Sequence, residues 1–113
     1  MKEPRLYLAH ILESIDWIKR DMAGLTREQF LANVPIQDAV ARRLEIIGEA
    51  ASNLPTDLKQ AHPEIKWTQI AGMRNILIHE YFGVNLERVW ATVKEDLPHL
   101  EATVLGIREM EPV

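Results

Sequence analysis

Hydrophobic residues recur along this chain at intervals of three and four, the spacing that gathers them on one face of an α-helix. Residues 5–23 carry the first such stripe: Leu8, Ile11, Ile15, Ile18 and Met22. The pattern predicts an amphipathic helix whose first turn contains Pro4, because a first-turn residue needs no amide hydrogen. Gly24 is expected to end this helix, since glycine readily adopts the left-handed conformation of a helix cap.

Two further helices are predicted before the middle of the chain. Thr26 and Gln29 have the spacing of a capping box, which predicts a short helix through Asn33. Residues 36–54 then carry the broadest apolar arc of the sequence, and an arc of that width is typical of the central helix of a bundle. Gly48 lies beside the arc, where the missing side chain would let a neighbouring helix approach closely.

The second half of the chain predicts a connector over residues 56–66, a helix beginning at Trp67 and a long last helix capped by Asn85. The last helix carries a coiled-coil-like seam: Leu86, Trp90, Val93, Leu97, Leu100, Val104 and Ile107. Such a seam requires a partner helix from the same chain or from another one. Pro98 removes one helical amide, so one bent helix is predicted rather than two.

These elements predict a single all-α domain over residues 1–113, an up-and-down bundle of four to five helices. The length suffices for a hydrophobic core without metal or disulfide support. The chain has no cysteine, which excludes a disulfide framework and suits a reducing cytoplasm. No apolar run approaches the roughly 20 residues of a membrane span, and the N-terminal residues lack a signal-peptide pattern. We therefore expect a cytoplasmic protein that does not enter the membrane.

The net charge of −4 argues against avid, indiscriminate binding of nucleic acid, which depends on neutralising phosphates. It leaves room for a local basic cleft. The candidate residues for such a cleft are Arg42, Arg43, Lys66, Arg74 and Arg88. The alternative is that each of these charges merely solvates a helix face.

The stretch 67–85, WTQIAGMRNILIHEYFGVN, combines an apolar ridge with a group of polar residues. Read as a helix at about 100° per residue, it places Ile70, Met73 and Leu77 on one narrow ridge. That ridge is expected to pack on the core. The helix is expected to close near residues 81–83, where Gly83 can take the left-handed cap conformation.

Four polar residues of this helix lie away from the ridge. Measured around the helix axis from Arg74, Asn75 lies at about 100°, His79 at about 140° and Tyr81 at about −20°. Arg74 and His79 are too far apart in angle to pair side by side. They can meet around one ligand only in a concave site, across a dimer seam, or where the helix distorts. This separation and the seam of the last helix together predict a homodimer.

Two segments resemble a known family. The residues MRNILIHEYFGVNLERVW, at 73–90, resemble the signature of HEPN-domain proteins, and most closely that of the HepT-like toxins. The motif of those toxins is an arginine, four residues, a histidine, one residue and a tyrosine. The segment RLEIIGEAA, at 43–51, is similar to the preceding core helix of the family. The likeness extends over most of the chain and implies an HEPN-like helical bundle, although the N-terminal third matches only in pattern.

Several enzyme classes lack their motifs in this sequence. HEYFG begins like a zincin motif but has no second histidine, and no cysteine is present to form another zinc site. Neither a glycine-rich phosphate loop nor a GxSxG turn occurs. No metal or cofactor is therefore expected, and acid–base chemistry without a metal remains.

Cleavage of RNA fits that remaining chemistry. The 2′-hydroxyl of RNA can attack the adjacent phosphate if a base removes its proton and an acid protonates the leaving oxygen. Histidine suits both roles near neutral pH, which makes His79 the candidate acid–base residue. Arg74 could bind two oxygens of the transition state, in which negative charge accumulates. Asn75 could orient His79 or hold a phosphate oxygen.

The resemblance implies more than the residues alone. HEPN proteins of this type are endoribonucleases that act as homodimers, with Arg74 and His79 of both subunits expected to line a shared cleft. In the HepT-like branch, the tyrosine that Tyr81 matches receives AMP from the partner antitoxin, a minimal nucleotidyltransferase (MNT). A bulky anion on Tyr81 could occupy Arg74 and exclude the RNA phosphate. The resemblance thus predicts a toxin with RNA as substrate and an MNT-type antitoxin as partner.

Less specific interpretations remain open. His79 can simply be favoured near a helix C-terminus by the helix dipole, and Tyr81 can pack as an aromatic at the helix end. The chain could also be a non-catalytic subunit that binds substrate or nucleotide for a nucleotidyltransferase, or a plain helical dimerisation module. His10, His62 and His99 belong to no recognisable group and are expected to be structural or exposed.

Overall fold

The computed structural model describes the backbone of residues 3–79 and 85–110 and the side chains of residues 3–74 and 85–110. Throughout these residues the regular elements are helical. They are α1 (Pro4–Met22), α2 (Arg27–Leu31), α3 (Val34–Ser52), α4 (Thr56–Gln60), α5 (Trp67–His79), α6 (Leu86–Ala91), the π-helical turn η2 (Thr92–Asp96) and α7 (Leu97–Met110). The predicted all-α class is confirmed. In the described part of the chain, no helix combines the length and apolarity needed to cross a lipid bilayer.

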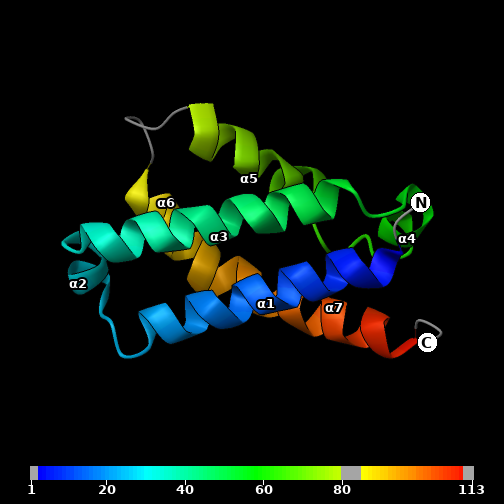
Figure 1. The fold of residues 1–113 in the computed structure, drawn as a ribbon, viewed down its shortest axis with the longest axis horizontal. Helices are drawn as coiled ribbons and strands as arrows, with labels where there is room; N and C mark the ends of the chain where they lie inside the picture. The colour runs from blue at the N-terminus through cyan, green and yellow to red at the C-terminus, as the bar shows by residue number, and fades with distance from the viewer. Residues whose placement is uncertain (1–2, 80–84, 111–113) are drawn as a thin grey trace.

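Helix α3 is the centre of the arrangement. It lies between α1 and α5 and packs against both (Figure 1). Helix α1 packs against α7 as well as against α3. The short α2 contacts α3 and α6. The prediction that the third helix is the central one is therefore confirmed. Because α5 is seated chiefly on α3, the residues of α3 determine how the motif helix is held.

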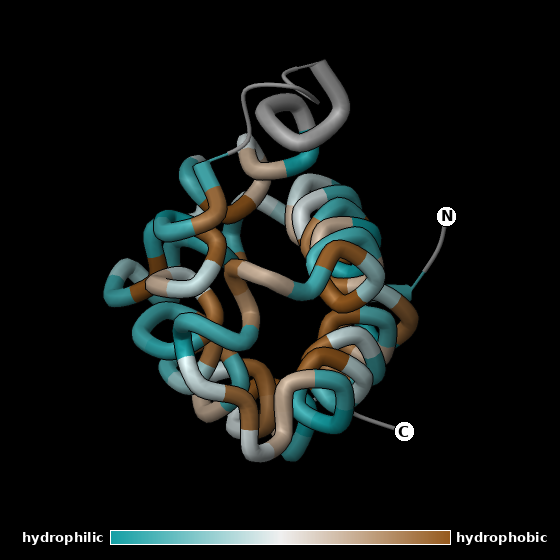
Figure 2. Tube along the Cα trace, turned by 90° about the vertical axis from the view of Figure 1, so that its left-hand side faces the viewer, coloured by the Kyte–Doolittle hydropathy of each residue, from teal (hydrophilic) through white to brown (hydrophobic). Residues whose placement is uncertain are grey.

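The core consists of the aliphatic stripes that the sequence predicts. Figure 2 shows hydrophobic positions on the sides of the helices that face one another and hydrophilic positions outside. The largest fully buried hydrophobic side chains are Leu8, Ile11, Ile15, Ile18, Phe30, Val40, Leu44, Ile47, Leu100 and Val104. Removing a side chain of this size from water contributes about 1.5–3 kcal/mol, so burial of these stripes is the main stabilising term.

The predicted capping box begins α2. The amide of Gln29 donates to Thr26 Oγ1 at 3.1 Å, and the amide of Thr26 donates to Gln29 Oε1 at 2.9 Å. Two of the amides that lack partners at a helix start are thus satisfied. The short helix that follows brings Phe30 into the core, where its ring lies 5.7 Å from that of Trp90.

Helix α3 is displaced by two residues from the predicted range. Asn33 Oδ1 accepts the amide of Ile36 at 3.1 Å, so the helix begins at Val34 and contains Pro35 in its first turn. At the other end the Glu49 carbonyl accepts from the Ser52 hydroxyl at 2.8 Å and from the Asn53 side-chain amide at 2.9 Å. These local hydrogen bonds compete with a further helical turn, and the helix ends at Ser52.

The last helical segment runs without interruption through α6, η2 and α7, as one helix rather than two. The prediction of a continuous helix is confirmed, but the proline is accommodated by a π-helical turn. The Leu97 amide bonds to the Thr92 carbonyl, one residue beyond the α-helical partner, directly before Pro98. The seam residues of α7 are buried in this chain, where α7 packs against α1. The seam therefore has its partner within the chain and does not by itself require a second copy.

Candidate functional site

Helix α5 lies unusually close to α3 at Gly48. A Cβ added there would lie 3.1 Å from the Ile70 carbonyl oxygen and 3.3 Å from that of Ala71, closer than side chains normally approach backbone. The predicted close approach at Gly48 is confirmed, and the neighbour is the motif helix. Ile70 is buried and Met73 packs on the core, so these two members of the predicted ridge face inward. The side chain of Leu77 lies outside the described residues.

Arg74 leaves α5 on the side away from that ridge and remains accessible. Its side chain is 36% exposed, and Nη1 donates to Oε2 of Glu49, which follows Gly48 on α3 and is 58% exposed. An ion pair this open to solvent contributes little to stability, about 0–1 kcal/mol. The carboxylate thus holds the guanidinium in place without burying it, and an anionic ligand can still reach it.

Arg74 stands at a groove of about 490 Å³ between α1, α3 and α5. The groove is lined by Tyr7, His10, Arg42, Glu45, Ile46, Glu49, Ala50, Asn53 and Arg74. A second ion pair lies in it, between Arg42 Nη1 and Glu45 Oε2 at 3.2 Å. The groove therefore offers two guanidinium groups, each held by a carboxylate, in a concave surface large enough for part of a nucleotide chain.

His10 is a residue of this groove that the sequence did not assign. It is exposed on α1 and lines the same hollow as Arg74. The expectation that His10 is exposed is confirmed, but it does not stand alone, because the packing of α1 against α3 brings it to the groove. Its spacing of three from Tyr7 places both on one flank of α1, beside the buried stripe. That flank is the only signal in the sequence, and it does not say which helix lies opposite.

His79 is described only by its backbone. Helix α5 continues without interruption from Arg74 to His79, so their Cα atoms are separated by about 140° around the helix and about 7.5 Å along it. The expected angular separation is confirmed. The side chains of Asn75 and His79, and all of Tyr81, lie outside the described residues, as does the predicted cap at Gly83.

The five candidates for a basic cleft do not gather in one place. Arg42 and Arg74 line the groove, whereas Lys66 and Arg88 do not. Lys66 immediately precedes α5, and Arg88 lies in α6. Arg43 is half-buried on α3, with its guanidinium carbon 5.4 Å from the centre of the Trp17 ring. The basic surface is thus carried by α3 and α5 and extends toward α1.

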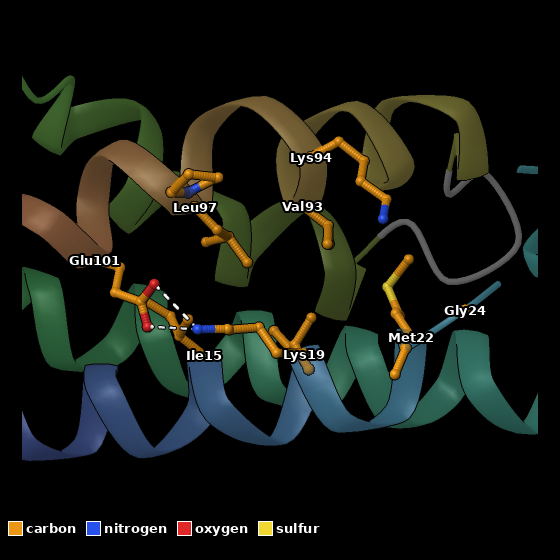
Figure 3. A pocket seen from close by; sticks show the side chains of 11 residues that line it. Ile15, Lys19, Met22, Gly24, Val93, Lys94, Leu97 and Glu101 are labelled. Atoms are coloured by element: carbon orange, nitrogen blue, oxygen red, sulfur yellow. Dashed lines mark hydrogen bonds and ion pairs between the residues drawn. The ribbon is translucent and has the colours of Figure 1, made fainter. Parts of the chain in front are cut away.

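A second hollow, of about 280 Å³, lies between the end of α1 and the segment from η2 to α7 (Figure 3). Its walls are largely aliphatic, and an ion pair links them, with 3.2 Å between Lys19 Nζ and Glu101 Oε2. Its described lining residues include no histidine or tyrosine. It therefore lacks groups suited to proton transfer near neutral pH, and the candidate site is the groove at Arg74.

Comparison with known proteins identifies the family. Residues 11–107 match the model of a family described as "Ribonuclease HepT-like". A protein of Thermococcus cleftensis named "Probable ribonuclease HepT" is 47% identical over 103 residues, which cover 91% of this chain and 94% of the relative. A protein of Caldanaerobacter subterraneus subsp. tengcongensis named "Putative RNase" is 43% identical over 111 residues, which cover 98% of this chain and 99% of the relative.

A longer relative carries a similar segment. It is a protein of Methanocaldococcus jannaschii named "Gamma-glutamylcyclotransferase and putative RNase", 45% identical over 108 residues, which cover 96% of this chain and 49% of the relative. No solved structure matches the chain. The family match spans most of the sequence, and relatives of nearly the same length align along almost their whole extent. This chain therefore belongs to the HepT-like family of ribonucleases.

Proposed function

We propose that this protein is a metal-independent endoribonuclease that cleaves RNA by attack of a 2′-hydroxyl on the adjacent phosphate. The observation that carries the proposal is the position of Arg74, half-exposed at a groove between three helices and held by a solvent-exposed carboxylate. A guanidinium buried in the core or tied into a closed network could not receive a phosphate. Membership of a ribonuclease family supports RNA as the substrate.

The reaction needs a base, an acid and a group that stabilises negative charge. A base removes the proton of the 2′-hydroxyl, whose oxygen forms a bond to phosphorus while the bond to the 5′-oxygen breaks. An acid gives a proton to that leaving oxygen, so the products are a cyclic phosphate and a free 5′-hydroxyl. We assign the proton transfers to His79, because an imidazole can act in both directions near neutral pH. Arg74 binds the non-bridging oxygens as their charge grows. Asn75 orients His79 or holds a phosphate oxygen.

A homodimer is part of the proposal. Arg74 and His79 lie on different sides of one continuous helix, so a single copy of α5 does not direct both toward one phosphate unless the groove curves around the ligand. A second copy of the chain would bring its own arginine and histidine to the contact between the two copies. The angular separation alone supports the dimer, because the α7 part of the apolar seam of the last helix packs against α1 within the same chain.

The proposal extends to a toxin that an MNT-type nucleotidyltransferase antitoxin neutralises by attaching AMP to Tyr81. Tyr81 follows Arg74 by seven residues, a spacing that returns to nearly the same side of a helix. On a helix that continued to residue 81, a bulky anionic adduct on this tyrosine would be on the same side as the guanidinium that binds substrate and two turns away, within its reach. Mass spectrometry of the chain co-expressed with such a transferase should show one added AMP, and Tyr81→Phe should prevent it. An unmodified wild-type chain would refute this extension.

The test of the nuclease is cleavage of RNA in the presence of EDTA. The wild-type protein should cut, and Arg74→Ala and His79→Ala should each lower the rate at least about a hundredfold, as expected for loss of a transition-state or proton-transfer group. Arg108→Ala, at an exposed arginine of α7, is the matched control and should keep full activity. Circular dichroism verifies that the variants remain folded. Undiminished cleavage in both site variants, or tight binding to a nucleotidyltransferase without any cleavage, would overturn the proposal.

A further inference from the structure

Trp17 forms an unusual surface cluster beside the groove. It lies on α1 and is 41% exposed, and two guanidinium groups lie over its ring. The guanidinium carbon of Arg20, one turn further along α1, is 5.1 Å from the ring centre, and that of Arg43, on α3, is 5.4 Å away. Isolated exposed hydrophobic residues are common, but an indole with two arginines within reach of its π-face is not. We call these three residues the Trp17 patch.

The two guanidinium groups of the patch are not held in ion pairs by the carboxylates that the structure describes. Among the side chains that the structure describes (3–74 and 85–110), neither Arg20 nor Arg43 forms an ion pair, whereas Arg42 and Arg74 are each paired with a glutamate. In a chain with a net charge of −4, two guanidiniums over one aromatic ring are a local concentration of positive charge. Such a surface attracts anions that also have a flat face to stack.

The patch continues the groove along the seam between α1 and α3. His10 and Trp17 are seven residues apart on α1, which places them on the same flank, two turns or about 10 Å apart. On α3, Arg43 of the patch follows Arg42, which lines the groove. The two helices lie side by side in Figure 1. A chain bound at Arg74 can therefore extend past Arg42 to Trp17 without leaving this surface.

We propose that the Trp17 patch binds an unpaired base and its flanking phosphates in single-stranded RNA that enters the Arg74 groove. The proposal rests on the ribonuclease function proposed above and assigns its substrate-binding path. A base that stacks on the indole displaces one guanidinium from the ring, and the released guanidinium then binds the adjacent phosphate. Bases within a duplex are already stacked and turned inward, so the patch selects unpaired segments.

The first experiment measures binding without cleavage. An unstructured oligoribonucleotide whose sugars are 2′-O-methylated cannot be cut by 2′-hydroxyl attack and serves as the probe. Trp17→Ala should weaken its binding about tenfold, whereas Trp17→Phe should keep affinity within about threefold, because a phenyl ring still stacks. Leu105→Ala, at an exposed apolar residue of α7, is the matched control and should bind like the wild type. Equal affinity in Trp17→Ala would overturn the proposal.

Fluorescence locates the contact. The chain has three tryptophans, and Trp67 is buried, whereas Trp90 lies on α6 against Phe30. Binding of the oligoribonucleotide should quench the emission of the wild type, and most of this quenching should be lost in Trp17→Phe even though binding persists. Retention of the full quenching in that variant would place the base elsewhere.

Salt dependence tests the two arginines. Binding of the same probe should follow a linear dependence of log K on log salt, and Arg20→Gln and Arg43→Gln should each lower the slope by about 0.7 for a lost phosphate contact on a single strand. Arg108→Gln should leave the slope unchanged. An unaltered slope in both patch variants would contradict the assignment of phosphates to them.

Two outcomes separate this inference from the proposed function. If the wild type binds the probe through Trp17 yet cuts no RNA, the nuclease proposal fails and the binding surface stands. If Arg74 is required for cleavage but Trp17→Ala binds normally, only the binding surface fails. Sedimentation of Trp17→Ala completes the design, because conversion of a wild-type dimer to a monomer by this substitution would show that the patch contacts a second copy and would overturn the RNA assignment.

Discussion

Gly48 of α3 lies against the backbone of Arg74: a Cβ added to Gly48 would be 3.2 Å from the Arg74 amide nitrogen. The next residue, Glu49, accepts a hydrogen bond from the guanidinium of the same arginine. Two consecutive residues of the central helix thus hold both ends of Arg74, one by leaving space and the other by its charge. The position of the proposed phosphate-binding group is therefore determined by α3, across the interface that seats α5.

Substitution of Gly48 should therefore disturb both stability and activity. Alanine is favoured over glycine inside a helix by about 1 kcal/mol, but a methyl group forced into a filled site costs about 1–3 kcal/mol. We expect Gly48→Ala to lower the free energy of unfolding by about 1 kcal/mol and to reduce RNA cleavage, because α5 must shift away from α3. Urea denaturation and a cleavage assay measure the two effects.

Gly106 is the matched control for Gly48. It lies inside α7, and a Cβ added there would meet nothing within 4 Å. Gly106→Ala should raise the free energy of unfolding by about 0.5–1 kcal/mol and leave cleavage unchanged, because only the helix propensity differs. Stabilisation of the same size by Gly48→Ala would show that α5 can move aside without cost.

Removal of the Glu49 charge should strengthen the binding of RNA. The carboxylate competes with a phosphate for Arg74, so we expect Glu49→Gln to lower the dissociation constant of an uncleavable oligoribonucleotide about two- to fivefold, an effect that fades as salt rises. Stability should change by less than about 1 kcal/mol because the pair is exposed. Glu101→Gln, which removes a comparable ion pair with Lys19 outside the groove, is the control. Weaker binding in Glu49→Gln would show that the carboxylate positions the guanidinium.

The helices could be predicted because each carries its own local signals. The stripe of α1, the broad arc of α3 and the Thr26–Gln29 box all arise from residues within a few positions of one another. The ends of α3 were less predictable, since side-chain hydrogen bonds of Asn33 and Asn53 lie at them and the apolar pattern does not reveal these bonds. Pro98 indicated an irregularity, because proline lacks the amide of a regular helix, but it did not indicate that a π-helical turn accommodates it.

The groove could be predicted only in part. The angular pattern of α5 shows that Arg74 faces away from the core, but its partner Glu49 is 25 residues earlier in the sequence. His10 and Trp17 reach the same surface only because α1 packs beside α3. Such pairings depend on which helices become neighbours and in what register, and a hydrophobic pattern fixes neither. A single chain likewise carries no direct sign of a second copy.

The capping box of α2 should contribute measurably to stability. Thr26→Ala removes the acceptor for the Gln29 amide, and loss of an N-cap of this kind costs about 1 kcal/mol. Thermal denaturation should show a lower melting temperature. Thr56→Ala is the control, because Thr56 lies inside the first turn of α4 after Pro55 and has no capping role. An unchanged melting temperature in Thr26→Ala would mean that water replaces the lost bond at no cost.

Ser14 offers a way to stabilise the protein without touching the groove. Its side chain, on α1, is 1% exposed, and Oγ has no hydrogen-bond partner among the described residues. A buried hydroxyl without a partner costs about 1–3 kcal/mol relative to an apolar group of similar size. We expect Ser14→Ala to raise the free energy of unfolding by about 1 kcal/mol in urea denaturation. Ser52→Ala, which removes an exposed hydroxyl that donates to the Glu49 carbonyl, should lower it slightly. Destabilisation by Ser14→Ala would instead mean that the hydroxyl makes a hydrogen bond, for example to a bound water, because its removal would then lose the free energy of that bond.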